Sequence, residues 1–266
     1  MDDVAFRLLL DRLNLDWEGY RKVRKGVKKR IRRHMRALDC RTLPEYLEVL
    51  DQKPVERTEC DRRMTVSISR FFRDRAMWTA LQERLLPGLI DRFPDKLNVW
   101  SAGCACGEEA YSFAIIWALL KRQVGCLPAL ELMATDTNAA SLERARIGRY
   151  PNSSLKELPE HVRSSFFESQ KGGKRFEIQS FLRQTVLFLP HNLLEGPPAQ
   201  RFHFIFLRNS LLTYFRDEIK IPAFRRIARS LAKGGLLIIG SHEKVPLSMV
   251  DLETDTQFDY VLRAVA

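Results

Sequence analysis

From Leu97 onward, short apolar runs alternate with segments of helical periodicity, and this alternation limits the fold more than any other feature of the chain. It is typical of βαβ units, in which helices connect parallel strands and cover the sheet. We therefore expect an α/β fold with a doubly wound, mostly parallel sheet. The expected strands span residues 97–101, 130–135, 186–189, 202–207 and 236–240, with 258–264 as a candidate for the last one. The expected helices span residues 108–121, 139–147 and 217–232, and the last should stop at Lys233-Gly234-Gly235.

The alternation stops between residues 150 and 184. Gly172-Gly173 is a turn signal in this stretch, and the aromatic residues Phe166, Phe167 and Phe176 flank it. We expect a small antiparallel β insertion here, outside the main sheet.

The N-terminal part of the chain has helical spacing and a strong positive charge. Ten of the sixteen residues from Arg21 to Arg36 are Lys or Arg. The apolar residues among and beside them share one helical stripe: Tyr20, Val23, Val27, Ile31 and Met35. We predict an amphipathic helix that packs on this stripe and is otherwise cationic. Further helices are expected at residues 45–50 and 74–93, the second kinked or divided at Pro87.

These patterns predict two domains: a basic, all-helical domain over residues 1–72 and an α/β domain over residues 73–266. The formal net charge of +11 indicates an acidic partner, which could be nucleic acid, an anionic membrane or an acidic protein. Aromatic residues do not interleave with the basic ones, and this argues against stacking on single-stranded bases.

The start of the chain is acidic, and no apolar run approaches the roughly 20 residues of a membrane span. We expect neither a secretory signal nor a membrane-spanning helix. The five cysteines show no disulfide framework and no zinc-ligand spacing. Reduced thiols in a cytoplasmic protein without a metal are the expectation.

The first candidate site follows the expected strand at 97–101. Gly103 and Gly107 form a turn that lets the backbone approach a ligand, and Glu108-Glu109 begin the next helix. The third glycine of a dinucleotide fingerprint and the Lys-Ser/Thr of a phosphate loop are both missing. Carboxylates at this place suit a ligand with an ammonium group, such as S-adenosylmethionine. The alternative is that the glutamates only cap the helix.

Polar residues also follow the next expected strands. Asp136 ends the strand at 130–135, where a carboxylate can bind ribose hydroxyls, although it could instead cap the following helix. Asn192 follows the strand at 186–189, where a turn asparagine is the favoured interpretation. Arg208-Asn209 end the strand at 202–207, at the edge where doubly wound sheets bind ligands.

These motifs, in this order, resemble the CheR family of chemotaxis-receptor methyltransferases. The resemblance extends over nearly the whole chain and includes the segments at residues 67–73, 146–150 and 234–243. It implies a Rossmann-like methyltransferase domain that binds S-adenosylmethionine and transfers its methyl group to receptor glutamates, forming methyl esters. It also implies that the helical front domain meets an acidic receptor segment, so the basic residues from Arg21 to Arg36 would dock an acidic protein substrate.

The resemblance also implies roles for individual residues. Arg73, Arg208 and Tyr214 would be the catalytic group. Glu109 would hold the ammonium, Asp136 the ribose, and Asn192 with Leu193 the adenine. The implied cofactor contacts are Ser67, Ser69, Arg73, Ala102, Gly103, Glu109, Asp136, Asn192, Leu193, Arg208 and Asn209.

Four departures from the family pattern keep other functions open. Ser67 and Ser69 replace the usual Asn and Thr, Ala110 replaces a usual proline, and the segment from Asn209 to Tyr214 is one residue longer. The order of residues at His242-Glu243-Lys244 also differs from the usual Gly-His-Ser-Glu. One alternative is a methyltransferase that acts on a small molecule or another protein. A second is a non-catalytic module that senses the cofactor and binds nucleic acid or a membrane through its basic helix.

Overall fold

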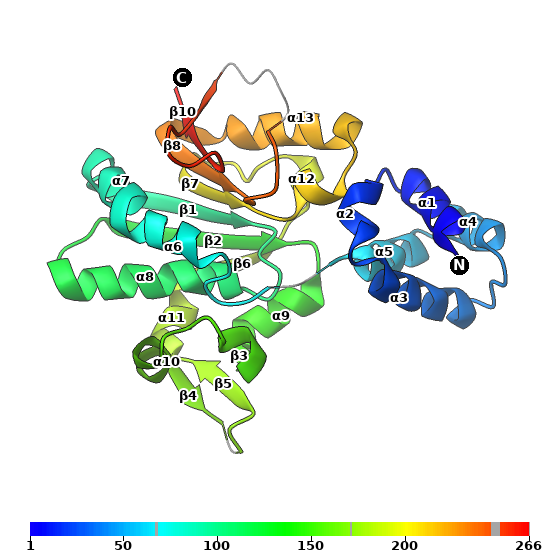
Figure 1. The fold of residues 1–266 in the computed structure, drawn as a ribbon, viewed down its shortest axis with the longest axis horizontal. Coiled ribbons are helices and arrows are strands. Elements are labelled where there is room, and N and C mark those ends of the chain that lie inside the picture. The colour runs from blue at the N-terminus through cyan, green and yellow to red at the C-terminus, as the bar shows by residue number, and fades with distance from the viewer. Residues whose placement is uncertain (67–68, 171, 246–250, 266) are drawn as a thin grey trace. The chain divides into compact units, whose positions relative to one another are not determined.

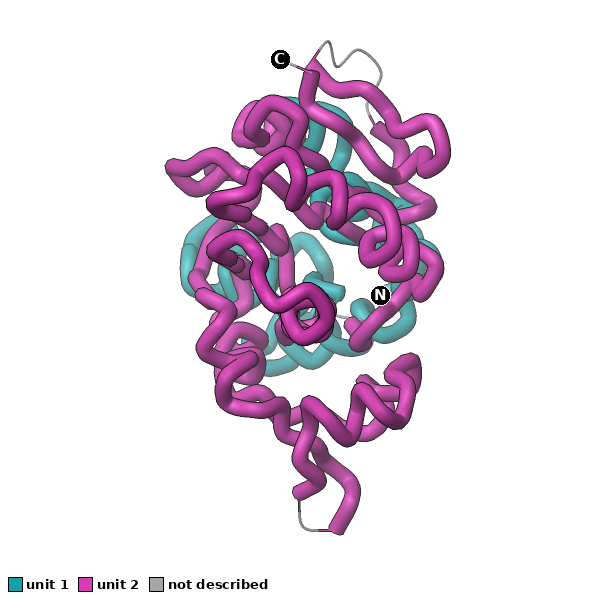
Figure 2. Tube along the Cα trace, turned by 90° about the vertical axis from the view of Figure 1, so that its left-hand side faces the viewer, with its two compact units in different colours: residues 1–67, 209–222 teal, residues 68–208, 223–266 magenta. Residues whose placement is uncertain are grey.

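The computed structural model describes residues 1–266 apart from 67–68, 171, 246–250 and 266. Its contacts divide the chain into two compact units (Figure 2). The first unit comprises residues 1–67 and 209–222, and the second comprises residues 68–208 and 223–266. This division differs from the expected boundary after residue 72, because residues 209–222 group with the N-terminal helices.

Backbone contacts explain why residues 209–222 group with the first unit. The short helix α12 (Leu211–Tyr214) packs against α2 (Trp17–Arg21). The N–H of Asp16 donates to the carbonyl of Tyr214 over 2.9 Å, and Leu15 forms an isolated β-bridge with Phe215. A sequence pattern of alternating elements carries no sign of such long-range pairing.

The first unit also contains α1 (Asp3–Arg12), α3 (Arg24–Ala37), α4 (Leu43–Gln52) and α5 (Pro54–Met64) (Figure 1). Its helices enclose their own apolar core. The largest side chains of that core that are almost fully buried are Phe6, Tyr20, Ile31 and Tyr46. Among the described residues, no helix is both long and apolar enough to cross a membrane.

The expected basic helix over residues 21–36 is wrong at its start. Arg21 ends α2, and α3 begins at Arg24 without a side-chain cap. The expected apolar stripe is confirmed, since Val27, Ile31 and Met35 are buried.

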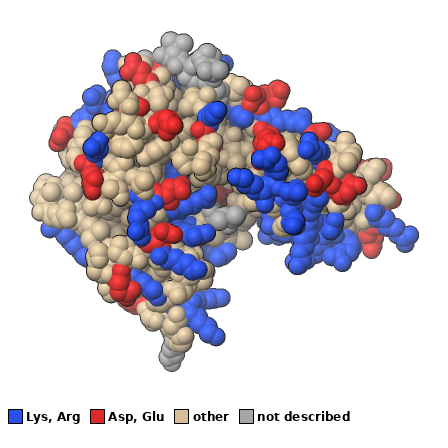
Figure 3. All heavy atoms as spheres, viewed as in Figure 1, with Lys and Arg blue, Asp and Glu red and all other residues tan. Residues whose placement is uncertain are grey.

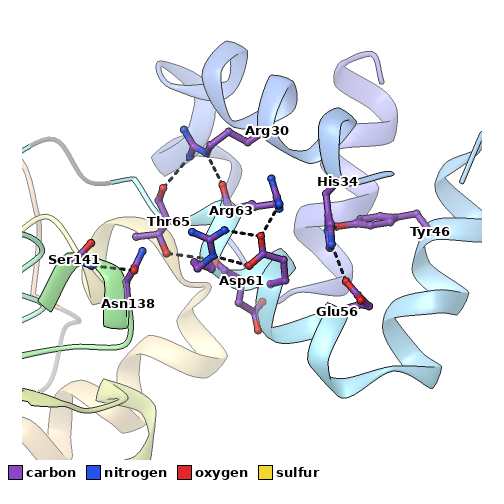
Figure 4. Close-up of polar contacts among 11 residues, drawn as sticks. Arg30, His34, Tyr46, Glu56, Asp61, Arg63, Thr65, Asn138 and Ser141 are labelled. Carbon is purple, nitrogen blue, oxygen red and sulfur yellow. Dashed lines mark hydrogen bonds and ion pairs between the residues drawn. The ribbon is translucent and has the colours of Figure 1, made fainter. Parts of the chain in front are cut away.

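Buried His34 joins the basic helix to two neighbours (Figure 4). Its ring nitrogens lie 2.8 Å from the hydroxyl of Tyr46 and 2.9 Å from a carboxylate oxygen of Glu56. A buried polar side chain costs stability unless it is hydrogen-bonded, and both nitrogens have partners here. His34 therefore ties α3 to α4 and α5.

The second unit is built on a seven-stranded sheet in the order β6-β2-β1-β7-β8-β10-β9. Neighbours from β6 to β8 are parallel, whereas β10 and β9 are antiparallel. This sheet confirms the predicted fold class. Its strands are β1 (Lys96–Ala102), β2 (Ala129–Asp136), β6 (Val186–Pro190), β7 (Phe202–Leu207), β8 (Leu231–Ile239), β9 (Leu252–Thr254) and β10 (Val261–Ala264).

Helices α8 (Glu108–Val124) and α9 (Ala139–Ile147) lie on one face of the sheet, and α13 (Asp217–Ala228) lies on the other (Figure 1). The expected helix over residues 74–93 is three segments: α6 (Arg75–Ala80), a π-helical turn (Leu81–Leu85) and α7 (Leu86–Arg92). Pro87 lacks an N–H and crowds the carbonyl of the preceding turn, which agrees with the wider turn just before it.

The helix predicted over residues 217–232 is wrong at its C-terminal end. Helix α13 ends at Ala228, and β8 already begins at Leu231, which pairs with Phe202. Gly234 has a φ of 78° and lies within β8, where the register with β7 shifts. The glycine therefore forms a β-bulge rather than a helix stop.

The predicted β insertion is confirmed as a three-stranded antiparallel sheet in the order β3-β5-β4. Its strands are β3 (Arg149–Pro151), β4 (Phe167–Ser169) and β5 (Arg175–Ile178). Three short helices accompany it: the 3-10 helix Asn152–Leu155, α10 (Glu160–Phe166) and α11 (Ser180–Thr185).

Candidate functional site

The carboxyl ends of β1, β2 and β7 lie next to one another in the second unit. Ala102 pairs with Thr135, and Ser101 pairs with Phe206. Asp136 is the last residue of β2, and Gly103 and Arg208 directly follow β1 and β7, so these three residues share one edge of the sheet. This edge is where doubly wound sheets bind their ligands.

The turn after β1 needs its glycines. Gly103 and Gly107 have φ values of 86° and 85°, in the left-handed region that glycine tolerates best. A Cβ on Gly107 would lie 2.9 Å from the Cβ of Ala145 and 3.0 Å from the ring of Phe188. The N–H of Gly103 donates to the carbonyl of Thr135 over 2.8 Å, which fixes the turn against the end of β2.

Asp136 faces this turn and is oriented by it. One carboxylate oxygen accepts the N–H of Ala105 at 2.9 Å, and the other accepts the N–H of Asn138 at 2.8 Å. The cap of α9 is Asn138, whose side chain accepts the N–H of Ser141 (Figure 4). The alternative interpretation of Asp136 as the helix cap is therefore wrong.

The chemistry of Asp136 suits a pair of ribose hydroxyls. Burial raises the pKa of its carboxyl group, and the backbone N–H groups partly oppose that rise. Hydroxyl donors on a ligand would stabilise the charged form further. Because its orientation is fixed before any ligand arrives, binding needs little reorganisation.

Glu109, Arg208 and Asp74 form an ion network beside the turn, with Arg208 buried and Asp74 partly exposed. Nη1 of Arg208 lies 3.0 Å from Oε2 of Glu109, and Nη2 of Arg208 binds Oδ2 of Asp74. The other oxygen of Glu109 accepts the hydroxyl of Ser101 at 2.8 Å. Arg208 was expected on the substrate side, but its terminal nitrogens bind two carboxylates and its side chain is only 4% exposed.

The segment before α6 is anchored on both sides of Arg73. The N–H of Phe72 donates to the hydroxyl of Ser112 at 3.0 Å, and the indole N–H of Trp78 donates to the carbonyl of Arg73 at 2.8 Å. Phe72 and Asp74 have φ values of 53° and 64°. Two left-handed non-glycine residues around one arginine are strained, and such strain is commonly retained at functional sites.

Ser69 lies beside Glu108, the first residue of α8. Burial raises the pKa of the Glu108 carboxyl group, and side-chain hydrogen bonds with Ser69 and Ser154 oppose the rise. Ser67 lies outside the described residues, so the structure gives no contact for it.

Asn192 caps a short turn after β6. Its side-chain oxygen accepts the N–H of Leu194 at 3.0 Å, at the start of the 3-10 helix Leu193–Glu195. The N–H of the preceding His191 donates to the carbonyl of Asp136 at 3.1 Å. The turn that carries Asn192 and Leu193 thus adjoins the end of β2.

Two predicted site residues belong to the first unit. Asn209 follows Arg208 directly and has a φ of 51°. Tyr214 lies on α12, with its ring centroid 5.0 Å from that of Tyr20. Arg73, Ala102, Gly103, Glu109, Asp136 and Arg208 all belong to the second unit.

The described residues at this edge of the sheet offer carboxylate and guanidinium groups to a ligand. They contain no group of three or more His, Cys, Asp or Glu that could hold a metal ion. Burial raises the pKa of the Cys104 and Cys106 thiols, and the charges of nearby carboxylates raise it further. Both turn cysteines are therefore protonated near neutral pH.

Asp74 and Ser101 were not among the site residues predicted from the sequence. Asp74 was treated only as the start of a helix, and Ser101 as part of a strand. A polar residue at the end of a buried strand could have drawn attention to Ser101. Nothing local marks Asp74, because its partner Arg208 lies 134 positions away.

The ionic balance of the network fits the expected cofactor. Two carboxylates, Glu109 and Asp74, flank the single guanidinium of Arg208. One negative charge therefore remains for a cationic ligand group, such as the ammonium of S-adenosylmethionine. The carboxylate of Asp136 and the glycine turn lie at the same edge of the sheet and fit its nucleoside.

Comparisons with known proteins identify similar sequences. The family model described as CheR methyltransferase, SAM binding domain, matches residues 67–261. A chemotaxis protein methyltransferase of Listeria monocytogenes is 36% identical over 222 residues, which are 83% of this chain and 82% of that protein. An uncharacterized 104.1 kDa protein of Rhodobacter capsulatus is 34% identical over 219 residues, 82% of this chain but 23% of that longer protein.

Similarity to solved structures is weaker. SAM-bound CalS10, an amino pentose methyltransferase from Micromonospora echinaspora, is 15% identical, with a TM-score of 0.36 over 67% of this chain and 57% of that chain. The family match rests instead on the sequence model and on the Listeria relative, each of which covers most of the chain. This chain belongs to the CheR methyltransferase family and contains its S-adenosylmethionine-binding domain.

Proposed function

We propose that the protein methyl-esterifies glutamate side chains of an acidic protein segment, such as one of a chemotaxis receptor. The observation that carries this proposal is the 36% identity, over most of both chains, to a protein named chemotaxis protein methyltransferase. Bound S-adenosylmethionine supplies an electrophilic methyl group on its sulfonium.

The residues of the second unit support a role in holding the cofactor. Asp136, held by two backbone N–H groups, would accept the ribose hydroxyls. Glu109, held by Ser101 and Arg208, would bind the ammonium. Arg73 would meet the carboxylate end, from a segment anchored at Phe72 and Trp78. Holding reactants in fixed geometry is itself a large source of rate enhancement.

A glutamate acceptor suits a site of this chemistry. A glutamate carboxylate has an ordinary pKa of about 4.3 and is ionised at neutral pH, so it needs no general base. The turn thiols Cys104 and Cys106 are kept protonated and would not compete as nucleophiles. Arg73 and Tyr214 would orient the acceptor by hydrogen bonds.

The basic face of α3 would dock the acidic segment. In Figure 3 the blue Lys and Arg atoms gather over the part of the first unit that α3 occupies in Figure 1. Lys28 binds Asp3, and Arg30 donates to the carbonyls of Arg63 and Thr65 (Figure 4). These two residues serve the fold of the unit.

Three other basic residues of α3 remain available for docking. Lys25, Lys29 and Arg33 are exposed, and none of them forms an ion pair with another described residue. Exposed like charges of this kind speed the encounter with an acidic partner, and salt weakens the effect.

Labelled methyl transfer tests the proposal. The protein is incubated with methyl-labelled S-adenosylmethionine and the purified signalling fragment of a chemotaxis receptor, and the product is treated with base. We expect label that base releases as methanol and that disappears when the receptor glutamates are replaced by glutamine. Base-stable label on another molecule would favour a different acceptor. No transfer, together with salt-sensitive DNA binding, would favour the non-catalytic alternative.

A further inference from the structure

We infer that Asp74 is a positioning residue for the amino-acid end of the cofactor, acting through Arg208 on Glu109. The inference deepens the proposed function, since it rests on the assignment of Glu109 to the ammonium. Asp74 touches neither reactant in this arrangement. Its effect is indirect: Asp74 binds one terminal nitrogen of Arg208 and leaves the other terminal nitrogen to Glu109.

The two terminal nitrogens of the Arg208 guanidinium bind different carboxylates. Nη1 of Arg208 binds Oε2 of Glu109 at 3.0 Å, while Nη2 binds Asp74. A guanidinium and a carboxylate otherwise prefer a two-bond, parallel pairing. With Asp74 holding Nη2, Glu109 is kept to a single bond with Arg208, and its other oxygen stays with Ser101.

Asp74 also sets the charge that the ligand meets. Arg208 contributes one positive charge, and Glu109 and Asp74 contribute two negative charges. Without the Asp74 carboxylate, Glu109 and Arg208 would cancel each other. The network would then have no excess charge to attract an ammonium group, although Glu109 itself would be unchanged. Because the Arg208 side chain is almost fully buried, solvent screens this charge only partly.

The backbone of Asp74 dictates which substitution is informative. Its φ of 64° is left-handed, a conformation that Asn and Asp adopt more readily than other non-glycine residues. Asp74→Asn therefore keeps the backbone and the side-chain shape and removes only the charge. The Asp74 side chain is 37% exposed, so water can hydrogen-bond to the neutral amide of the variant.

Comparing the affinities for two ligands distinguishes a positioning role of Asp74 from general damage to the structure. S-Adenosylhomocysteine carries the amino-acid end with its ammonium, whereas methylthioadenosine carries the nucleoside without it. We expect Asp74→Asn to weaken binding of S-adenosylhomocysteine about tenfold, which corresponds to about 1.4 kcal/mol. Binding of methylthioadenosine should stay within about twofold of wild type. Isothermal titration calorimetry on the full chain measures both affinities.

A matched control removes an exposed carboxylate elsewhere on the same run of helices. Asp91→Asn lies on α7, where Asp91 is exposed and forms no ion pair with another described residue, and it should leave both affinities unchanged. Equal weakening of both ligands by Asp74→Asn would overturn the inference, and so would no weakening of either. These binding results do not depend on the methyl acceptor, so a negative methanol test would leave them standing.

Discussion

The ring of Tyr214 packs against the ring of Tyr20, with the centroids 5.0 Å apart and the planes at 57°. The hydroxyl of Tyr20 in turn donates to the carbonyl of Met64 at 3.2 Å. Tyr214 is therefore part of the packing of the helical unit. Its predicted place near the transferred methyl group stays a prediction, and packing and catalysis can be tested separately.

Two substitutions of Tyr214 should have different consequences. Tyr214→Phe keeps the ring against Tyr20 and removes only the hydroxyl, so we expect methyl transfer to fall at least tenfold while the packing of the ring is retained. Tyr214→Ala removes the ring as well and should lower the stability of the protein by about 2–3 kcal/mol, near the low end for aromatic truncation because the ring is only partly buried. Initial rates and thermal melts measure the two effects. Full activity in Tyr214→Phe would show that the hydroxyl has no catalytic role.

Gly19 allows α12 to approach α2 closely. A Cβ at Gly19 would lie 2.1 Å from the carbonyl oxygen of Thr213 and 3.2 Å from the ring of Tyr214. Gly19→Ala should therefore push the two helices apart and reduce the free energy of unfolding by about 1–3 kcal/mol. Urea unfolding followed by circular dichroism measures the change.

Gly26 provides the matched control for Gly19. It lies in the neighbouring helix α3, and the nearest atom to an added Cβ is Nη1 of Arg30 at 3.9 Å. Gly26→Ala should stabilise the protein by about 0.5–1 kcal/mol, because alanine favours a helix more than glycine does. Destabilisation by both substitutions would contradict the steric explanation for Gly19.

The sequence predicted the sheet and one side of the site because both follow from local pattern. Central parallel strands are continuous apolar runs, so β7 was predicted with its correct bounds. A polar residue directly after such a strand must lie at its carboxyl end, which is why the sequence placed Asp136 and Arg208 at this edge of the sheet. Their positions along the chain fix their positions in the fold.

Features that depend on distant partners were not predictable in this way. Asp74 gains its role from Arg208 and Glu109, and helix α12 packs with helices that lie some 200 residues earlier in the chain. Gly234 looked like a helix stop because the pairing of Leu231 with Phe202 is not visible in the sequence. In each of these places the structure depends on a tertiary contact that the local sequence does not show.

Cofactor affinity should depend on the protonation of Asp136. Burial raises the pKa of this carboxyl group above its ordinary 3.8, so it takes up a proton at a higher pH in the folded protein than in the unfolded chain. As the pH falls through that raised pKa, the contribution of Asp136 to folding stability increases, while its ability to accept charged hydrogen bonds from ribose is lost. Binding of S-adenosylhomocysteine should weaken accordingly.

Calorimetry across the acidic range, with two variants, isolates the contribution of Asp136. In Asp136→Asn the affinity should already be low and should vary little with pH. Burial also raises the pKa of the Glu108 carboxyl group. Glu108→Gln is therefore the control, and it should keep the pH dependence of the wild type. A pH dependence that survives in Asp136→Asn would assign the titration to another group.

Reversing charge on the basic face of α3 should impair the protein acceptor and spare the cofactor. Lys25, Lys29 and Arg33 are exposed without ion pairs to described residues, so the triple change to Glu leaves the packing stripe and the Asp3 contacts intact. We expect kcat/KM for an acidic protein substrate to fall at least tenfold at low ionic strength, and the difference from wild type to shrink as salt screens the charges. The affinity for S-adenosylhomocysteine should not change.

The control for this triple variant carries the same change in charge on the second unit. Lys121, Arg225 and Arg229 are exposed on or just after α8 and α13, away from the basic face of α3 in the sequence. Reversing these three charges changes the net charge of the protein equally, so a loss of turnover caused only by net charge would appear in both variants. A loss confined to the α3 variant, and reduced by salt, assigns docking to that helix. Equal turnover in both variants and in wild type would mean that the acidic substrate docks elsewhere.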